Sequence, residues 1–139
     1  MHRYACPVPL QIPPNCDLTL GLVCVDKSVT GTTVWRMRVD ERFLNPAGIM
    51  QGGFLSAVLD SAMGASAVSV SEGRKVSVAN TEMKVSFLRP ARVGEVLTCT
   101  ATVLKAGGVI TFVEAKIVNE DEKVVATASS SYLIRERAE

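Results

Sequence analysis

The sequence NPAGIMQGGFLSAVLDSAMG, residues 45–64, decides the fold of this 139-residue chain. A glycine pair, Gly52-Gly53, opens a helical run that carries one acid, Asp60. At about 100° per residue, small side chains share the side of the helix that bears Asp60, while large apolar side chains project from the other side. The small residues are Gly53, Ser56, Ala57, Gly64 and Ala67. We therefore predict a helix with one packed face and one open face around a carboxylate.

The residues that precede this helix predict a turn and an exposed helix start. Asn45-Pro46 and Gly48 are turn formers. The N–H groups of Gly52 and Gly53 fall in the first helical turn, where they have no intrahelical partner and the helix dipole is positive. Such a helix start suits an oxyanion. The alternative stays open that Asp60 is an ordinary surface acid, the more common setting of a lone helical aspartate.

Strands are expected on both sides of the helix. Residues 18–25 and 32–39 are rich in β-branched and apolar residues and flank the turn signal Thr30-Gly31, which predicts a hairpin. After Glu72-Gly73 the apolar pattern has a period of two, typical of half-buried strands. The later strands are expected around residues 82–87, 97–103, 109–118 and 124–133. An antiparallel sheet wrapped around one apolar helix, an α+β fold, is the predicted arrangement.

Length and composition predict one domain over residues 18–139, preceded by a loosely ordered, proline-interrupted arm over residues 1–17. A hydrophobic content of 47% is enough for a sizeable core, and the net charge of +1 without a basic block disfavours nucleic acid as a partner. The arm lacks the continuous apolar segment of a signal peptide, so a cytoplasmic protein without membrane attachment is expected.

The cysteines and the single histidine argue against metal and triad chemistry. Cys6, Cys16, Cys24 and Cys99 have no C-x-x-C spacing and are interpreted as reduced thiols. His2 is the only histidine, which disfavours a Ser-His-Asp triad and a histidine-rich metal site. We expect neither a metal nor another cofactor.

The motif residues resemble those of the hotdog-fold acyl-CoA thioesterases. The resemblance is to the phenylacetate-pathway branch of the 4-hydroxybenzoyl-CoA thioesterase superfamily, whose signature is an Asn, a Gly, a His-Gly-Gly and an acid eight residues after the first Gly of that pair. The corresponding residues here are Asn45, Gly48, Gln51-Gly52-Gly53 and Asp60. A second segment, NTEMKVSFLRPA over residues 80–91 followed by Gly94-Glu95, is similar to a later strand and turn of that family. The resemblance spans roughly residues 18–134, and it departs from the signature at Gln51, where the family has His.

This resemblance implies a hotdog fold, an acyl-CoA substrate and a homodimer with shared active sites, commonly paired again into a homotetramer. Hydrolysis of a thioester is the expected reaction, with the carbonyl oxygen at the Gly52 N–H and Asp60 as general base or direct nucleophile. Asn45 and Gln51 are candidates for positioning the thioester or the water. For these two residues, loop closure and helix capping respectively are equally open alternatives.

Further candidates for binding the substrate come from the glycines and the second segment. Arg89 and Arg92 are candidate donors to coenzyme A phosphates, although solvated charges at a strand end are the more ordinary explanation. The remaining candidates are Gly48, Gly53, Asn80 and Thr81, the last two aligning only loosely with a Ser or Thr of the family.

Helix geometry gives an independent argument for a dimer. Asp60 lies seven residues after Gly53, which is about 10 Å along the axis and too far for both to act on one carbonyl group. Two antiparallel helices across a two-fold axis would bring Asp60 of one subunit to the glycines of the other. The alternative function is a non-catalytic hotdog module that binds acyl-CoA or a related ligand.

Overall fold

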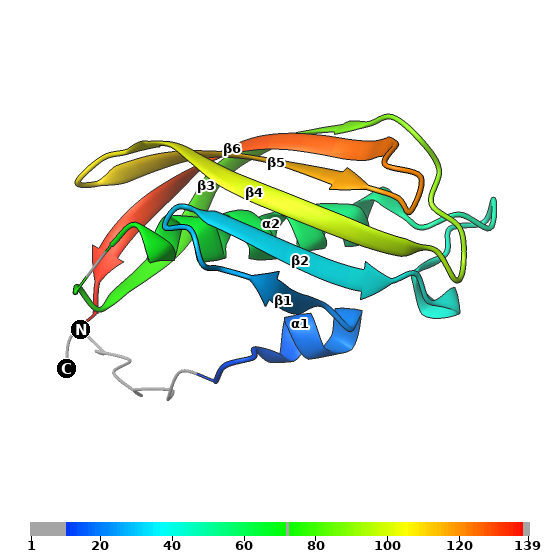
Figure 1. Cartoon of the computed structure of the whole chain (residues 1–139), viewed down its shortest axis with the longest axis horizontal. Helices are drawn as coiled ribbons and strands as arrows, with labels where there is room; N and C mark the ends of the chain where they lie inside the picture. Colours follow the sequence, from blue (N-terminus) through cyan, green and yellow to red (C-terminus); the bar gives the residue numbers. More distant parts are fainter. Residues whose placement is uncertain (1–10, 72, 138–139) are drawn as a thin grey trace, which may run out of the picture.

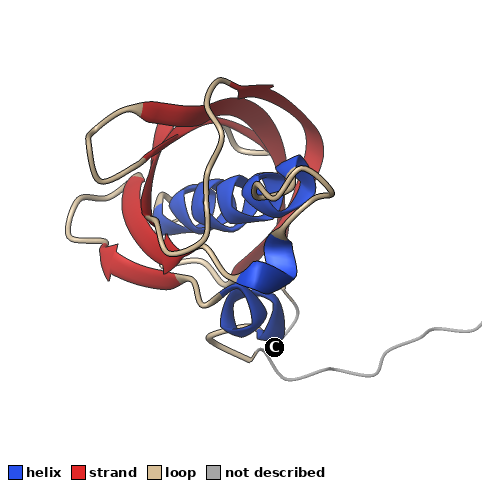
Figure 2. Ribbon diagram, turned by 90° about the vertical axis from the view of Figure 1, so that its right-hand side faces the viewer, coloured by secondary structure: helices blue, strands red, loops and turns tan. Residues whose placement is uncertain are grey.

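The computed structural model describes residues 11–71 and 73–137, and its centre is the predicted helix, α2 (Gly52–Ser69). A six-stranded antiparallel sheet curls around α2, so that the helix lies inside the curve (Figures 1 and 2). The strand order is β1-β2-β4-β5-β6-β3. The bounds are β1 (Val23–Asp26), β2 (Thr32–Arg38), β3 (Val76–Phe87), β4 (Val96–Ala106), β5 (Ile110–Val118) and β6 (Val124–Glu136). The predicted α+β arrangement is confirmed.

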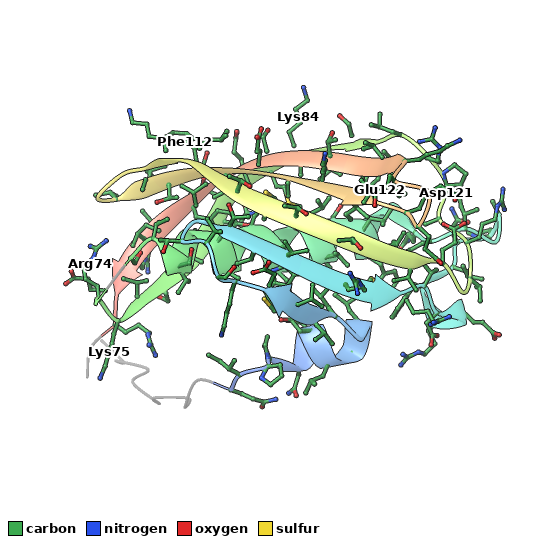
Figure 3. The ribbon with its side chains drawn as sticks, viewed as in Figure 1. Arg74, Lys75, Lys84, Phe112, Asp121 and Glu122 are labelled. Carbon is green, nitrogen blue, oxygen red and sulfur yellow. The ribbon has the colours of Figure 1, made fainter. Side chains whose placement is uncertain are left out.

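Alternation of side chains explains why the strands form this sheet. In β5, Val113, Ala115 and Ile117 are buried toward α2, while Phe112 and Glu114, on either side of Val113, are exposed on the outer face. Figure 3 shows the side chains of Phe112 and Lys84 projecting from that outer face, away from α2. The core therefore lies between the inner face of the sheet and the helix.

The helix is buried on the side that the sheet covers. Leu59, Ala62 and Met63 are fully buried, whereas Asp60 is exposed. Ala67, which the helical projection places on the open face, is also buried. A Cβ added at Gly64 would lie 3.6 Å from a ring carbon of Tyr132, so β6 packs closely against this part of the helix. The small residues therefore leave room for β6 to pack over the C-terminal half of this face of α2.

The prediction of a strand over residues 18–25 is only partly correct. The sequence predicts that residues 18–25 are extended, but α1 (Asn15–Leu20) is a short helix that ends at Gly21, whose φ of 66° is left-handed. Only Val23–Asp26 is a strand. Tertiary packing favours the helix, because Leu20 of α1 joins the hydrophobic core and the Ser61 hydroxyl of α2 donates a 2.7 Å hydrogen bond that compensates the buried Asp17 carboxylate.

The boundary of the N-terminal arm also differs from the prediction. The arm is predicted over residues 1–17, but Asn15 to Asp17 already belong to α1. His2 and Cys6 lie outside the described residues. A short 3-10 helix, η1 (Glu41–Phe43), links β2 to the loop before α2. Within the described part of the chain, no helix has the length and apolarity needed to cross a membrane.

A stability comparison of two leucines tests this placement of the core. Leu59 in α2 is fully buried and Leu104 in β4 is 59% exposed. We expect Leu59→Ala to lower the free energy of unfolding by about 2–5 kcal/mol, because it leaves a cavity between helix and sheet. Leu104→Ala, the same chemical change at the surface, should cost less than about 1 kcal/mol. Urea denaturation measures both, and equal losses would contradict the described core.

Candidate active site

The start of α2 presents backbone donors next to an exposed aromatic ring. Gln51 is the N-cap residue, and its own N–H donates to the Phe43 carbonyl at 2.8 Å. Among the described residues, no acceptor pairs with the N–H groups of Gly52 and Gly53. A Cβ on Gly52 would lie 2.9 Å from the Phe87 ring, so a glycine is what lets this ring approach the helix start. The geometry leaves two donors available for an oxyanion.

The Gln51 side chain does not cap the helix. It makes no capping hydrogen bond, and its Oε1 would lie 3.4 Å from a Cβ placed on Gly53. The capping alternative for Gln51 is therefore wrong. The side chain is exposed beside the first turn of α2, where a bound group could contact its amide.

Asn45 closes the loop that leads into α2. Its side-chain oxygen accepts hydrogen bonds from the N–H groups of Ala47, at 2.9 Å, and Ile49, at 3.2 Å. Gly48, with a φ of 78°, completes the turn by donating its N–H to the Asn45 carbonyl. The loop-closure alternative describes what the side-chain oxygen of Asn45 does. No described acceptor is bonded to its amide nitrogen.

The Asp60 carboxylate is held through one of its two oxygens. The Tyr132 hydroxyl donates to Asp60 Oδ1 at 2.7 Å, and the Asn80 amide donates to the same oxygen at 3.1 Å. No described residue donates to Oδ2. Burial, and after it the bonded Asp60 carboxylate, raise the pKa of Tyr132 far above its ordinary value. The hydroxyl therefore keeps its proton and remains a donor to the carboxylate.

An irregularity in β3 brings Asn80 to this position. In the pairing of β3 with β6, Asn80 is opposite Tyr132 and Glu82 is opposite Ser131, so Thr81 is the extra residue of a β-bulge. The Thr81 hydroxyl donates to the Ser131 carbonyl at 3.1 Å and makes no contact with Asp60. Of the two loosely aligned candidates, the structure brings Asn80 to the acid and leaves Thr81 bonded to the backbone.

The two arginine candidates lie near the helix start rather than near Asp60. They flank Ala91, whose carbonyl accepts a 2.8 Å hydrogen bond from the N–H of Met50. Arg89 donates through Nη1 to the Val124 carbonyl at 3.0 Å, and Arg92 is exposed. Figure 1 shows the loop after β3, the turn between β5 and β6 and the start of α2 at the same end of the molecule.

Sequence reasoning missed Tyr132 and its neighbour Ser130. The Ser130 hydroxyl lies 3.0 Å from Asn80 Oδ1 and 2.7 Å from the Glu82 carbonyl. A buried tyrosine in a strand was the available signal, since a buried hydroxyl requires a partner. The register that aligns residue 132 with residue 80 is not apparent from the sequence.

The Cys99 thiol, possible metal ligands and the outer face of the sheet were the other places in the described residues where a site could lie. Burial raises the pKa of the Cys99 thiol to about 12, so it is protonated and unreactive. Within residues 11–71 and 73–137, no group of three His, Cys, Asp or Glu side chains could hold a metal ion. A depression of about 470 Å³ lies on the outer face of the sheet and is lined by residues such as Lys84, Glu114 and Lys116, not by Asp60.

Comparison with known proteins agrees with this geometry. Residues 47–126, more than half of the chain, match the model of the thioesterase superfamily. Acyl-coenzyme A thioesterase 13 of Homo sapiens is 27% identical over 107 residues, which are 76% of this chain and 74% of that protein. Among solved structures, the E. coli PaaI protein from the phenylacetic acid degradation operon superposes with a TM-score of 0.81 at 26% identity, covering 90% of this chain and 86% of that one. A phenylacetic acid degradation-related protein from Ralstonia eutropha JMP134 has a TM-score of 0.74 at 31% identity, with 86% and 89% covered. These superpositions confirm the predicted hotdog fold.

Substitutions at Asn45 test its role in the loop. We expect Asn45→Ala to lower the free energy of unfolding by about 1–2 kcal/mol, because two backbone N–H groups lose their acceptor. Asn45→Asp keeps an acceptor oxygen and should stay within about 0.5 kcal/mol of the original chain. Thermal or urea unfolding of the two variants gives the comparison. An alanine variant as stable as the aspartate variant would show that the side chain does not close the loop.

Proposed function

The chain belongs to the thioesterase superfamily, as its sequence predicts, and we propose that it hydrolyses acyl-CoA thioesters to a free carboxylic acid and coenzyme A. The observation that carries this proposal is the exposed Asp60 carboxylate, which Tyr132 and Asn80 hold by Oδ1 while Oδ2 receives no donor from the described residues. A fixed carboxylate with one free oxygen can take a proton from water or attack a carbonyl carbon. The relative named acyl-coenzyme A thioesterase 13 supports the choice of substrate class.

The reaction needs charge stabilisation at one point and a base or nucleophile at another. The thioester oxygen would lie at the Gly52 N–H, where the positive end of the helix dipole stabilises negative charge. As a general base, Asp60 takes a proton from water while the water oxygen adds to the carbonyl carbon; the C–S bond then breaks, and the proton on Asp60 passes to the departing sulfur to give the thiol. As a nucleophile, its carboxylate adds to the carbonyl carbon, the C–S bond breaks to release coenzyme A thiolate, and water then hydrolyses the resulting acyl anhydride to the free acid and the Asp60 carboxylate.

The glycine N–H groups and the Asp60 carboxylate can act on one thioester only if they come from two copies of the chain. Along one helix, Asp60 is about 10 Å from the Gly53 backbone. In the described chain, β3 is an edge strand of twelve residues, and a long unpaired edge is a ready site for antiparallel pairing with an identical strand. A two-fold contact along this edge would give a homodimer in which Asp60 faces the partner's glycines. Pairing of two dimers into a homotetramer, in the cytoplasm, belongs to the same proposal.

Several residues near the helix start would bind the rest of the substrate. The Gln51 amide and the Asn45 amide nitrogen are available to orient the thioester or the water. Gly48 and Gly53 keep the backbone accessible beside them. Arg92 and the unbonded part of the Arg89 guanidinium would contact coenzyme A phosphates at the same end of the fold. Thr81 would contribute only through its place beside Asn80.

Gln51 is the observation that favours a second function. A neutral amide stands where the family signature has an imidazole, so a module that binds acyl-CoA without hydrolysing it is the alternative. A panel of aryl, short aliphatic and long aliphatic acyl-CoA thioesters distinguishes the two. Release of free thiol with any of them supports the enzyme, whereas saturable binding without release supports the module.

Replacement of Asp60 tests the assignment of the acid. We expect Asp60→Asn to lower kcat on the best thioester by about 10²–10⁴-fold, since the amide can neither accept the proton nor attack the carbonyl. Glu114→Gln, the equivalent change on the outer face of the sheet, should leave kcat unchanged. Thiol release measured with both variants decides the matter. An Asp60→Asn protein with the original kcat would remove Asp60 from the mechanism.

Mixed dimers test the shared site. Asp60→Ala and Gly52→Pro homodimers should both be nearly inactive, because proline removes the N–H of residue 52. In a mixed dimer, one of the two sites combines the intact Asp60 of one chain with the intact Gly52 of the other. We therefore expect recovery of up to half of the activity per heterodimer, measured by thiol release after mixing.

The Gly52→Pro chain must first be shown to fold, by circular dichroism, because proline also fixes the backbone at the helix start. Folded heterodimers without recovery would contradict the shared site. Asp60 would then have to work with donors of its own chain.

A further inference from the structure

Tyr132 of β6 is a buried strand residue whose side chain contacts α2. It is 2% exposed, and its ring lies against Gly64 of α2. Its hydroxyl reaches the helix at Asp60, with the carboxylate Oδ1 at 2.7 Å and the Asp60 carbonyl at 3.1 Å, and it also accepts a longer hydrogen bond, 3.4 Å, from the Asn80 amide of β3. A hydroxyl has one proton, so the shorter bond, to the charged oxygen, takes it. A buried side chain is thus bonded to the one exposed acid of α2.

A second donor fixes the same oxygen from β3. Asn80 directs its amide nitrogen to Asp60 Oδ1 at 3.1 Å, and the Ser130 hydroxyl lies 3.0 Å from the other end of that amide. Because the carboxylate oxygen only accepts, the amide turns its NH₂ group toward Asp60. Tyr132 and Asn80 are also opposite one another in the register of β3 and β6, so both donors come from one cross-strand pair.

We propose that Tyr132 is a positioning residue, with Asn80 as the second donor, and that together they bind Asp60 Oδ1 so that Oδ2 is the oxygen that reacts. This inference rests on the proposed function of Asp60. All the groups belong to one chain, and the carboxylate is therefore oriented in each subunit before a partner supplies the glycine donors.

Tyr132→Phe is the direct test, because phenylalanine keeps the ring against Gly64 and removes only the hydroxyl. Loss of one hydrogen bond to a charged group predicts a fall in kcat of about 10- to 100-fold, with KM within about twofold, since the substrate does not touch the hydroxyl. The second measurement uses Asp60→Asn as background. There Tyr132→Phe should have no further effect, because a residue that acts through Asp60 has nothing left to orient.

The outcomes separate this inference from the proposed function. A wild-type protein without thioester hydrolysis, or an Asp60→Asn protein with full activity, would overturn both. A dead Asp60→Asn protein beside a folded Tyr132→Phe protein of wild-type kcat would overturn only the role of Tyr132. Equal fold-losses from Tyr132→Phe in the wild-type and Asp60→Asn backgrounds would also overturn it, since they indicate a general effect on structure.

A second variant keeps the test decisive if Tyr132→Phe does not fold. Asn80 is only half-buried, so Asn80→Ala removes the other donor to Oδ1 without emptying the core. The same pattern is expected: lower kcat, unchanged KM and no added loss with Asp60→Asn. Wild-type kcat in a folded Asn80→Ala protein would contradict the role of the donor pair.

Mixed dimers show whether Tyr132 acts within its own chain. Tyr132→Phe combined with Gly52→Pro should recover one good site, since Tyr132 and Asp60 are both intact in the Gly52→Pro chain and the Tyr132→Phe chain supplies Gly52. Tyr132→Phe combined with Asp60→Ala should recover none, because the only Asp60 in that dimer belongs to the chain without the tyrosine hydroxyl. Full recovery of a site in the second mixture would overturn the positioning of Asp60 by Tyr132 of its own chain.

Discussion

The sheet of this protein covers α2 incompletely, and the side of the helix left open determines where a charged group can lie. Leu59, Ala62 and Met63 are fully buried under the sheet, and an ionised carboxylate on that side would lose its hydration without compensation. Asp60 follows Leu59 directly, and the turn of about 100° per residue carries it to the open side. The apolar packing that stabilises the fold therefore also presents one acid to the surface.

Closure of the sheet has a second consequence at the same acid. Strands β3 and β6 reach the edge of the open face, where Gly64 lets the Tyr132 ring lie against the helix. The bulge at Thr81 adds one residue to β3 beside Asn80. Two donors from paired strands thus meet one oxygen of a helical carboxylate. In this way, the pairing of residues that are 52 positions apart in the sequence determines the orientation of a single side chain.

The sequence predicts most of the fold because its local patterns agree with the final packing. The helix of residues 52–69 and the strands after it follow from glycine signals and periods that survive in the structure. The segment of residues 18–25 does not, because a short apolar run fits a strand or a helix equally well, and the long-range packing of Leu20 and the Ser61–Asp17 hydrogen bond decide between them. The site divides similarly: the helix start and Asp60 are local features, whereas Tyr132 joins them only through the long-range pairing of β3 with β6.

Because Gln51 stands where the family signature has a histidine, the proposed site has no imidazole that could exchange a proton near neutral pH. A glutamine amide and the N–H groups of Gly52 and Gly53 can orient and stabilise but cannot exchange a proton. In the proposed mechanism the only proton acceptor is then Asp60, and its geometry matters more than it would beside an imidazole. The Tyr132 hydroxyl, whose pKa burial raises, is suited to that task because it restrains the carboxylate without competing for the proton. Each chain would therefore carry an oriented acid, and dimerisation would add the oxyanion donors without having to reorganise it.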